Sequence, residues 1–235
     1  EREIKAFKSK PFWQIQLDAE YKSQAITAWH KEDKFWEKQK ADDVIKKTKN
    51  EKEAKVDRVE KKQFNQMPPF PFDLTSLQLE AYRCFHISPK ETLEIAQELY
   101  TSGIISYPRT SSQQLPPSIG YKKILNELGK NKEYSELIKN LLRISKLSPN
   151  NGKKTDPAHP AIFPTGIIHE GLNERESKIY DLVVKRFAST FADNAVRETM
   201  TVDISCNSEI FIAKGTRTLE KGWHKFYEPY VRLEE

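Results

Sequence analysis

The chain has few of the features that mark secreted, metal-binding or membrane-spanning proteins. Its 235 residues include only two cysteines, Cys84 and Cys206, and their spacing matches no metal-binding motif. Two isolated cysteines are typical of a reduced intracellular compartment, so we expect a cytoplasmic protein. No apolar run approaches the length needed to cross a bilayer, and residues 1–5 (EREIK) are too charged for a signal peptide. These absences argue against a disulfide scaffold and a membrane partner.

The length and charge of the chain also limit the class of protein. Charged residues make up 31% of the sequence and apolar residues 37%, which is enough for a sizeable core in one large or two small domains. The net charge of +5 is modest for a nucleic-acid-binding protein and indicates little by itself. We interpret residues 1–5 as the end of a charged helix that belongs to a longer protein.

Alternating apolar residues near the amino terminus predict β-strands. Residues 12–19 alternate with period two, and the apolar stretch 25–29 is predicted to pair with them. Residues 52–66 are highly charged with few apolar anchors, and we expect an edge strand there. Residues 35–49 predict a helix whose final lysines suit the electrostatics of a helix C-terminus.

Three large aromatic residues in this region allow two interpretations. Trp29, Phe35 and Trp36 could stack against nucleic-acid bases. We favour a buried hydrophobic cluster, because large aromatic side chains are highly buried on average.

A proline-rich connector at residues 67–72 (MPPFPF) separates this region from a helical one, because prolines at this density exclude a helix or a central strand. Beyond it, Thr75 and Gln78 have the spacing of a capping box. A second helix is predicted to begin at Ser88 and to end before Gly103. Its expected apolar stripe consists of Leu93, Ala96 and Tyr100. Further helices are predicted at residues 119–128, 134–142 and 174–191.

The alternating pattern returns after residue 194, so strands are predicted at both ends of the chain and helices between them. The fold class predicted from this order is α+β. We expect a discontinuous strand-rich domain made from residues 1–69 and 194–235, with a helical domain of residues 70–193 inserted into it.

The segment at residues 103–117 (GIISYPRTSSQQLPP) combines groups that suit a phosphodiester. The phenol of Tyr107 can attack phosphorus, and the guanidinium of Arg109 can hold two phosphate oxygens. Three hydroxyls follow, those of Thr110, Ser111 and Ser112. The chemistry alone leaves another interpretation open, in which the tyrosine is a packed aromatic and the arginine a solvated charge.

A second irregular segment at residues 151–166 (NGKKTDPAHPAIFPTG) is rich in proline and glycine, which exclude a regular element. It contains His159, which on such a loop is most often an ordinary surface histidine. Its two lysines, Lys153 and Lys154, are candidates for binding phosphates.

The two segments resemble the two signatures of type IA DNA topoisomerases, and most of all the archaeal topoisomerase I and III branch. The string ISYPRTSS at residues 105–112 is similar to the family's tyrosine motif. The string AHPAIFPT at residues 158–165 is similar to its histidine motif. They stand in the family's order and at about its spacing, which makes the pair more specific than either motif alone.

The resemblance implies a role for each matching residue. Tyr107 would be the nucleophile and Arg109 the phosphate clamp, and His159 would assist with a hydrogen bond. Candidate DNA contacts are Thr110, Ser111, Ser112, Lys153 and Lys154. Many relatives carry an acidic residue in the run where this chain has Ser111 and Ser112, so the role of that acid has no counterpart here.

The implied reaction breaks and rejoins single-stranded DNA through a 5′-phosphotyrosine intermediate. It would relax negative supercoils or decatenate DNA without ATP. The implied fold is an arch, which is the discontinuous strand-rich domain, and a helical domain that carries the tyrosine.

In the family, magnesium is held by an Asp-x-Asp cluster in a separate Toprim domain, and this chain contains no Asp-x-Asp. We therefore expect no metal site in this chain and a fragment that is inactive alone. Its expected partners are single-stranded DNA and the Toprim and neighbouring domains of the same enzyme, which would act as a monomer.

Two alternatives stay open at this point. The chain could be the topoisomerase part of a reverse gyrase, which uses the same tyrosine chemistry and adds a helicase-like module. It could also be a noncatalytic module that binds single-stranded DNA through basic and aromatic side chains.

Overall fold

The computed structural model describes residues 2–144, 147–167 and 171–233, which divide into two compact units. The first unit contains the described residues up to 64 together with 197–217, and the second contains 65–196 and 218–233. Residues 218–233, which the sequence analysis placed in the strand-rich domain, thus group with the helical unit.

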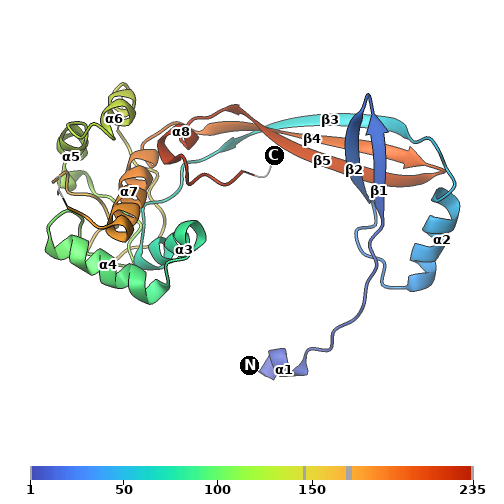
Figure 1. Cartoon of the computed structure of the whole chain (residues 1–235), viewed down its shortest axis with the longest axis horizontal. Helices are drawn as coiled ribbons and strands as arrows, with labels where there is room; N and C mark the ends of the chain where they lie inside the picture. Colours follow the sequence, from blue (N-terminus) through green and yellow to red (C-terminus); the bar gives the residue numbers. More distant parts are fainter. Residues whose placement is uncertain (1, 145–146, 168–170, 234–235) are drawn as a thin grey trace. The chain divides into compact units, whose positions relative to one another are not determined.

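Figure 1 shows the helices and strands in chain order. The strands are β1 (Gln16–Tyr21), β2 (Gln24–His30), β3 (Lys55–Gln66), β4 (Ala195–Cys206) and β5 (Glu209–Glu220). The longer helices are α2 (Lys38–Thr48), α3 (Leu74–Phe85), α4 (Pro89–Thr101), α5 (Tyr121–Leu128), α6 (Ser135–Leu141) and α7 (Glu174–Ser189). The short ones are α1 (Arg2–Ala6), the 3₁₀ turn η1 (Pro117–Ile119) and α8 (His224–Tyr227).

The strands form a five-stranded antiparallel sheet in the order β1-β2-β5-β4-β3. Gln16 lies opposite Trp29 in the β1–β2 pair, and Trp29 lies opposite Ile212 in the β2–β5 pair. Strand β3 lies at the edge of the sheet, which confirms the edge strand predicted for residues 52–66. The chain therefore adopts a mixed α and β fold, as predicted.

Both tight hairpins of the sheet use two-residue turns with left-handed backbone. The φ angles are 49° and 63° at Lys22 and Ser23, and 44° and 69° at Asn207 and Ser208. Such turns suit hairpins because their twist matches the right-handed twist of the flanking strands. The turns thereby fix the register of β1 against β2 and of β4 against β5.

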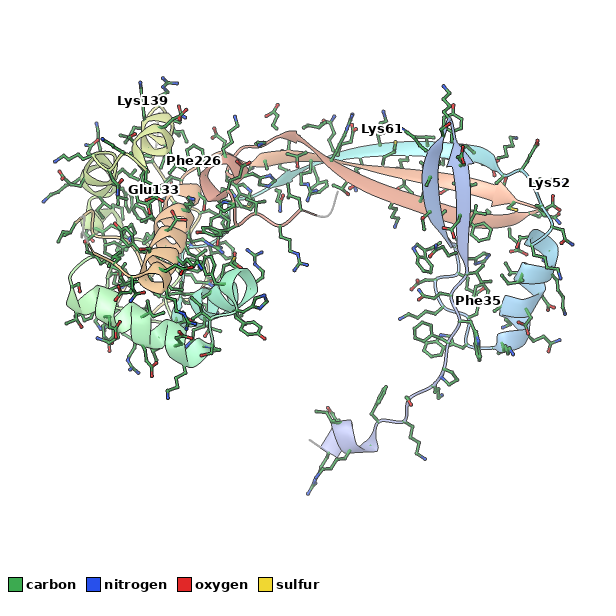
Figure 2. All side chains as sticks on the ribbon, in the orientation of Figure 1. Phe35, Lys52, Lys61, Glu133, Lys139 and Phe226 are labelled. Atoms are coloured by element: carbon green, nitrogen blue, oxygen red, sulfur yellow. The ribbon has the colours of Figure 1, made fainter. Side chains whose placement is uncertain are left out.

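The first unit has a small hydrophobic core that includes Phe35 (Figure 2). Helix α2 contributes the buried Ala41 and Val44 to this core. The other buried members are Ile15, Ala28, Ile204, Cys206 and Phe211. The expected aromatic cluster is wrong for two of its three members, since Trp29 and Trp36 are exposed. Each follows a buried residue in extended backbone, where successive side chains point to opposite faces.

Helix α7 forms the centre of the core of the second unit. Its residues Ile179, Val183 and Phe187 are buried, as their spacing predicts, and Phe191 continues the row just beyond the helix. Helices α3, α4 and α8 pack against α7. This core supports the irregular segments that follow α4 and precede α7.

The cap of helix α3 and the buried face of helix α4 differ from the sequence-based predictions. Helix α3 is capped by Asp73 and Ser76, not by Thr75 and Gln78: the Ser76 amide donates to Asp73 Oδ1 at 2.7 Å. The Asp73 backbone is extended as it leaves the proline-rich connector, which places its carboxylate ahead of the first turn. On α4 the buried face is Thr92, Ile95, Ala96 and Leu99, and Tyr100 is exposed because it lies off this face.

A partly buried charged cluster joins α3, α7 and α8. The Glu80 carboxylate accepts hydrogen bonds from Arg83 Nε at 2.8 Å, Arg186 Nη2 at 3.0 Å and Tyr227 Oη at 2.7 Å. The Arg186 guanidinium also lies 4.2 Å from the ring centroid of Phe72. Burial alone would raise the pKa of Glu80, but the hydrogen bonds from Arg83 and Tyr227 and the charge of Arg186 lower it below its usual range.

We expect Glu80→Gln to lower the free energy of unfolding at neutral pH by about 3 kcal/mol, because it leaves the largely buried Arg186 side chain without a carboxylate. The pKa of Glu80 is lower in the folded chain than in the unfolded chain. Its contribution is therefore complete above the unfolded value of about 4.3 and is lost as the pH falls through the folded value. Denaturant unfolding at neutral and acid pH measures both effects.

The matched control is Glu174→Gln, which removes an exposed carboxylate that pairs with the partly exposed Lys178 and should leave stability almost unchanged. Equal stability of wild type and Glu80→Gln at neutral pH, or a difference that stays constant into acid, would contradict the account.

Candidate active site

The candidate site lies where two irregular segments of the second unit pair. We call residues 103–117 the tyrosine loop and residues 150–166 the histidine loop. At one end, the Ser106 amide donates to Phe163 O at 2.8 Å and the Thr165 amide donates to Ile104 O at 3.0 Å. At the other end, further backbone bonds run from Gln113 N to Lys154 O, from Gly152 N to Gln113 O and from Ala161 N to Gln114 O. The two loops therefore satisfy each other's backbone groups without a regular strand.

The paired loops are anchored to the helical core. The Leu74 amide at the start of α3 donates to Thr110 O at 3.0 Å, and the Ile162 amide donates to Phe72 O at 2.8 Å. Apolar side chains of both loops are buried at the same time, namely Ile104, Ile105, Leu115, Ala161 and Ile162. Since both the backbone and the side chains of the loops are held, the residues between the anchors have fixed positions.

The pairing brings Tyr107 and His159 together. Their ring centroids lie 4.5 Å apart with an interplanar angle of 44°, and Tyr100 packs edge-on against Tyr107 at 5.3 Å. The Tyr107 side chain is partly buried, whereas His159 is exposed. The exposed Arg109 makes no ion pair within the part of the chain that the structure describes. A phenol, an imidazole and an available guanidinium thus come from one short stretch of surface.

The backbone of His159 is fixed from both sides. Its amide and that of Ala158 each donate to Asp156 Oδ1 at 3.0 Å, and its carbonyl accepts from Thr110 Oγ1 at 3.3 Å. Ser111 Oγ donates to the other carboxylate oxygen of Asp156 at 3.3 Å. The amides of Ala158 and His159 hold the pKa of Asp156 below its usual range. Asp156 stays ionised at neutral pH and closes the turn that presents His159.

The role of Asp156 was not predicted from the sequence. The signal was present, because an aspartate before proline in a loop commonly bonds to backbone amides two or three residues later. That signal indicates a turn but does not indicate which residue the turn orients.

The three hydroxyls after Arg109 have different environments. Thr110 and Ser112 are buried. The hydroxyl oxygen of each accepts a hydrogen bond from the backbone amide two residues later, at 3.0 Å for Thr110 and 3.1 Å for Ser112. Ser111 is exposed. The buried hydroxyls are therefore engaged in shaping the tyrosine loop, and a DNA contact of all three stays a prediction.

The two lysines of the histidine loop also differ. Lys154 Nζ lies 2.9 Å from the buried Asp73 Oδ2, which ties the histidine loop to the cap of α3. Burial raises the pKa of Asp73, but hydrogen bonds from Ser76 and Lys154 more than offset this and lower it. Lys153 is exposed and is the more available of the two for a phosphate.

The described residues do not fit a metal ion. Across residues 2–144, 147–167 and 171–233, no three His, Cys, Asp or Glu side chains are arranged to hold one. The chemistry proposed for these residues therefore includes no step on magnesium.

None of the helices in residues 2–144, 147–167 and 171–233 has the length and apolar character needed to span a membrane.

The chain belongs to the DNA topoisomerase family, whose model matches residues 1–235. Among its relatives, the DNA topoisomerase 1 of Pyrococcus horikoshii is 44% identical over 237 residues, covering 100% of this chain and 34% of that protein. The DNA topoisomerase 1 of Methanocaldococcus jannaschii is 46% identical over 228 residues, covering 97% of this chain and 29% of that protein. These matches confirm the resemblance to the type IA, archaeal topoisomerase I branch.

A solved structure agrees at the level of fold. The full-length topoisomerase I of Thermotoga maritima superposes with a TM-score of 0.68 at 22% identity, covering 100% of this chain and 39% of that one. The chain thus spans about a third of the length of the curated relatives it matches.

We expect Asp156→Ala to loosen His159, because two backbone amides lose their acceptor. Amide exchange at His159 should become about tenfold faster, and the ring-current shift that Tyr107 imposes on the His159 signals should shrink. Asp156→Asn keeps an acceptor oxygen and should stay close to wild type. Because the pKa of Asp156 is lowered on folding, its carboxylate should stay ionised and the shift in wild type should persist below pH about 4, where an ordinary aspartate takes up a proton. NMR measures both, and identical spectra for wild type and Asp156→Ala would refute this role.

Proposed function

We propose that this chain supplies the tyrosine-bearing part of a type IA DNA topoisomerase, in which Tyr107 attacks a phosphodiester of single-stranded DNA. The observation that carries the proposal is the Tyr107–His159 ring contact at 4.5 Å, on loops that also present Arg109. The family membership supports the same reaction class.

The proposed reaction exchanges one phosphodiester for another. The Tyr107 oxygen forms a bond to phosphorus while the bond from phosphorus to the 3′ oxygen breaks. The phenol loses its proton, and the departing 3′ oxygen gains one to become a hydroxyl. The product is a 5′-phosphotyrosine, and attack by the 3′ hydroxyl reverses the step after another strand has passed. The number of phosphodiesters does not change, so relaxation or decatenation requires no ATP.

Two side chains would stabilise the charge that develops on the phosphate. The Arg109 guanidinium is exposed and can hold two phosphate oxygens in one plane. His159 lies against Tyr107 and can donate one hydrogen bond to the same phosphate. A phenol is mostly protonated at neutral pH, so the attack also needs a proton acceptor. We propose that this acceptor and the magnesium site belong to a Toprim domain outside these residues.

The proposed domain organisation follows from the same resemblance. Residues 1–69 and 194–235 would form the arch, and residues 70–193 the inserted domain with the tyrosine. The division of the described residues near positions 64 and 196 supports the insertion, with residues 218–233 packed on the helical side. Exposed Lys153 and Ser111, on the same paired loops as Tyr107, are the DNA contacts that the burial pattern favours.

The proposal is tested on the full-length enzyme that contains this chain. Tyr107→Phe should abolish the covalent DNA adduct and leave binding of single-stranded DNA nearly intact, because only the attacking oxygen is removed. Arg109→Lys should reduce cleavage without abolishing it, since the charge stays but the planar fork is lost. His159→Ala should reduce cleavage about 10 to 100-fold, as expected for one charge-assisted hydrogen bond. Trapping of labelled oligonucleotide on denatured protein measures the adduct.

Tyr100→Phe is the matched control, because Tyr100 contacts the Tyr107 ring but has no proposed chemical role, and it should cleave like wild type. The isolated 235-residue chain should form no adduct in magnesium. An adduct that survives Tyr107→Phe would exclude Tyr107 as the nucleophile.

A further inference from the structure

The first unit exposes two large aromatic rings that touch each other. Phe12 and Trp36 are 43% and 59% exposed, and their ring centroids lie 5.7 Å apart with an interplanar angle of 58°. Single exposed aromatic residues are common on protein surfaces, but two in contact form a continuous apolar platform.

The core of the first unit dictates that these rings face outward. Trp13 and Phe35 form an antiparallel bridge with two backbone hydrogen bonds of 2.9 Å, and Phe35 points into the core. Side chains alternate between the two faces of extended backbone, so the next pair, Phe12 and Trp36, points to the opposite face. The platform is therefore a consequence of the packing of Phe35 and does not depend on a mobile side chain.

Lysines flank the platform in the sequence, and one of them lies against it. Lys34 Nζ lies 4.9 Å from the centroid of the Phe12 ring. Residues 5–12 contain three lysines and no acidic residue, and residues 31–40 contain four lysines against three acidic residues. Within these residues Asp33 accepts from Gln14 at 2.7 Å, and Glu37 pairs with one of the four lysines, Lys40, at 3.3 Å. The excess charge is complementary to a polyanion.

We propose that Phe12, Trp36 and Lys34 form a stacking site for single-stranded nucleic acid. Unpaired bases present a flat face that stacks on aromatic rings, and the lysines match the adjoining phosphates. A duplex hides its base faces and would gain only the charge. The site rests on the proposed function in one respect, since that function makes single-stranded DNA the substrate, but it is separate from the tyrosine and histidine loops.

Two measurements on the full-length enzyme test the site. Trp36→Ala should weaken binding of single-stranded oligothymidine about tenfold, which is the value of one base stack, whereas Trp36→Phe should keep most of the affinity. Photo-crosslinking with iodouracil in the same oligonucleotide should label a peptide that contains Phe12 or Trp36. Binding of duplex DNA should change little in either variant.

The matched control is Tyr21→Ala, because Tyr21 is also exposed and has Lys22 Nζ 5.3 Å from its ring centroid, but no aromatic ring of the described residues packs against it. The affinity of Tyr21→Ala for single-stranded oligothymidine should fall by less than about twofold. Equal losses for Tyr21→Ala and Trp36→Ala, an unchanged affinity in Trp36→Ala, or an equal loss for duplex DNA would overturn the stacking site. At saturating DNA the Tyr107 adduct should form equally in wild type and Trp36→Ala. A complete lack of adduct in wild type would instead refute the proposed function. The stacking site would then be tested by the binding measurements alone.

Discussion

The close pairing of the tyrosine loop with the histidine loop is the constraint on which the site depends. The loops meet where Gly152 approaches Gln113, and a Cβ atom at residue 152 would lie 2.3 Å from Gln113 Oε1 and 2.8 Å from its Cβ. Only glycine permits that approach without displacing Gln113, whose amide and carbonyl both bond to the histidine loop. Tyr107 and His159 are far apart in sequence and become neighbours because the two loops pair along their length.

Polar side chains replace regular secondary structure around the site. Thr110 and Asp156 hold the backbone of His159, and Lys154 joins its loop to the Asp73 cap of α3. Each bond satisfies a polar group of the chain with another group of the chain. The arrangement is therefore rigid before any ligand binds, which reduces the cost of positioning a phosphate beside Tyr107.

The sequence predicted most regular elements because their apolar residues repeat with a clear period, as in β1 and α7. It also predicted that Tyr107 and His159 belong to one site, through the two motifs. It did not predict the role of Asp156, because irregular loops carry no periodic signal and their contacts come from distant segments. The exposure of Trp36 was missed for a related reason: the burial of Phe35 decides it, and composition favours burial for both.

The central claim is that the paired loops present Tyr107 as the nucleophile. It is tested most directly by trapping the covalent complex of the full-length enzyme with labelled single-stranded DNA, digesting it and identifying by mass spectrometry the residue that carries the nucleotide. The account predicts a single modified residue, Tyr107. Modification of another tyrosine, such as the neighbouring Tyr100, or of Tyr121, whose hydroxyl donates to Leu115 O, would contradict it.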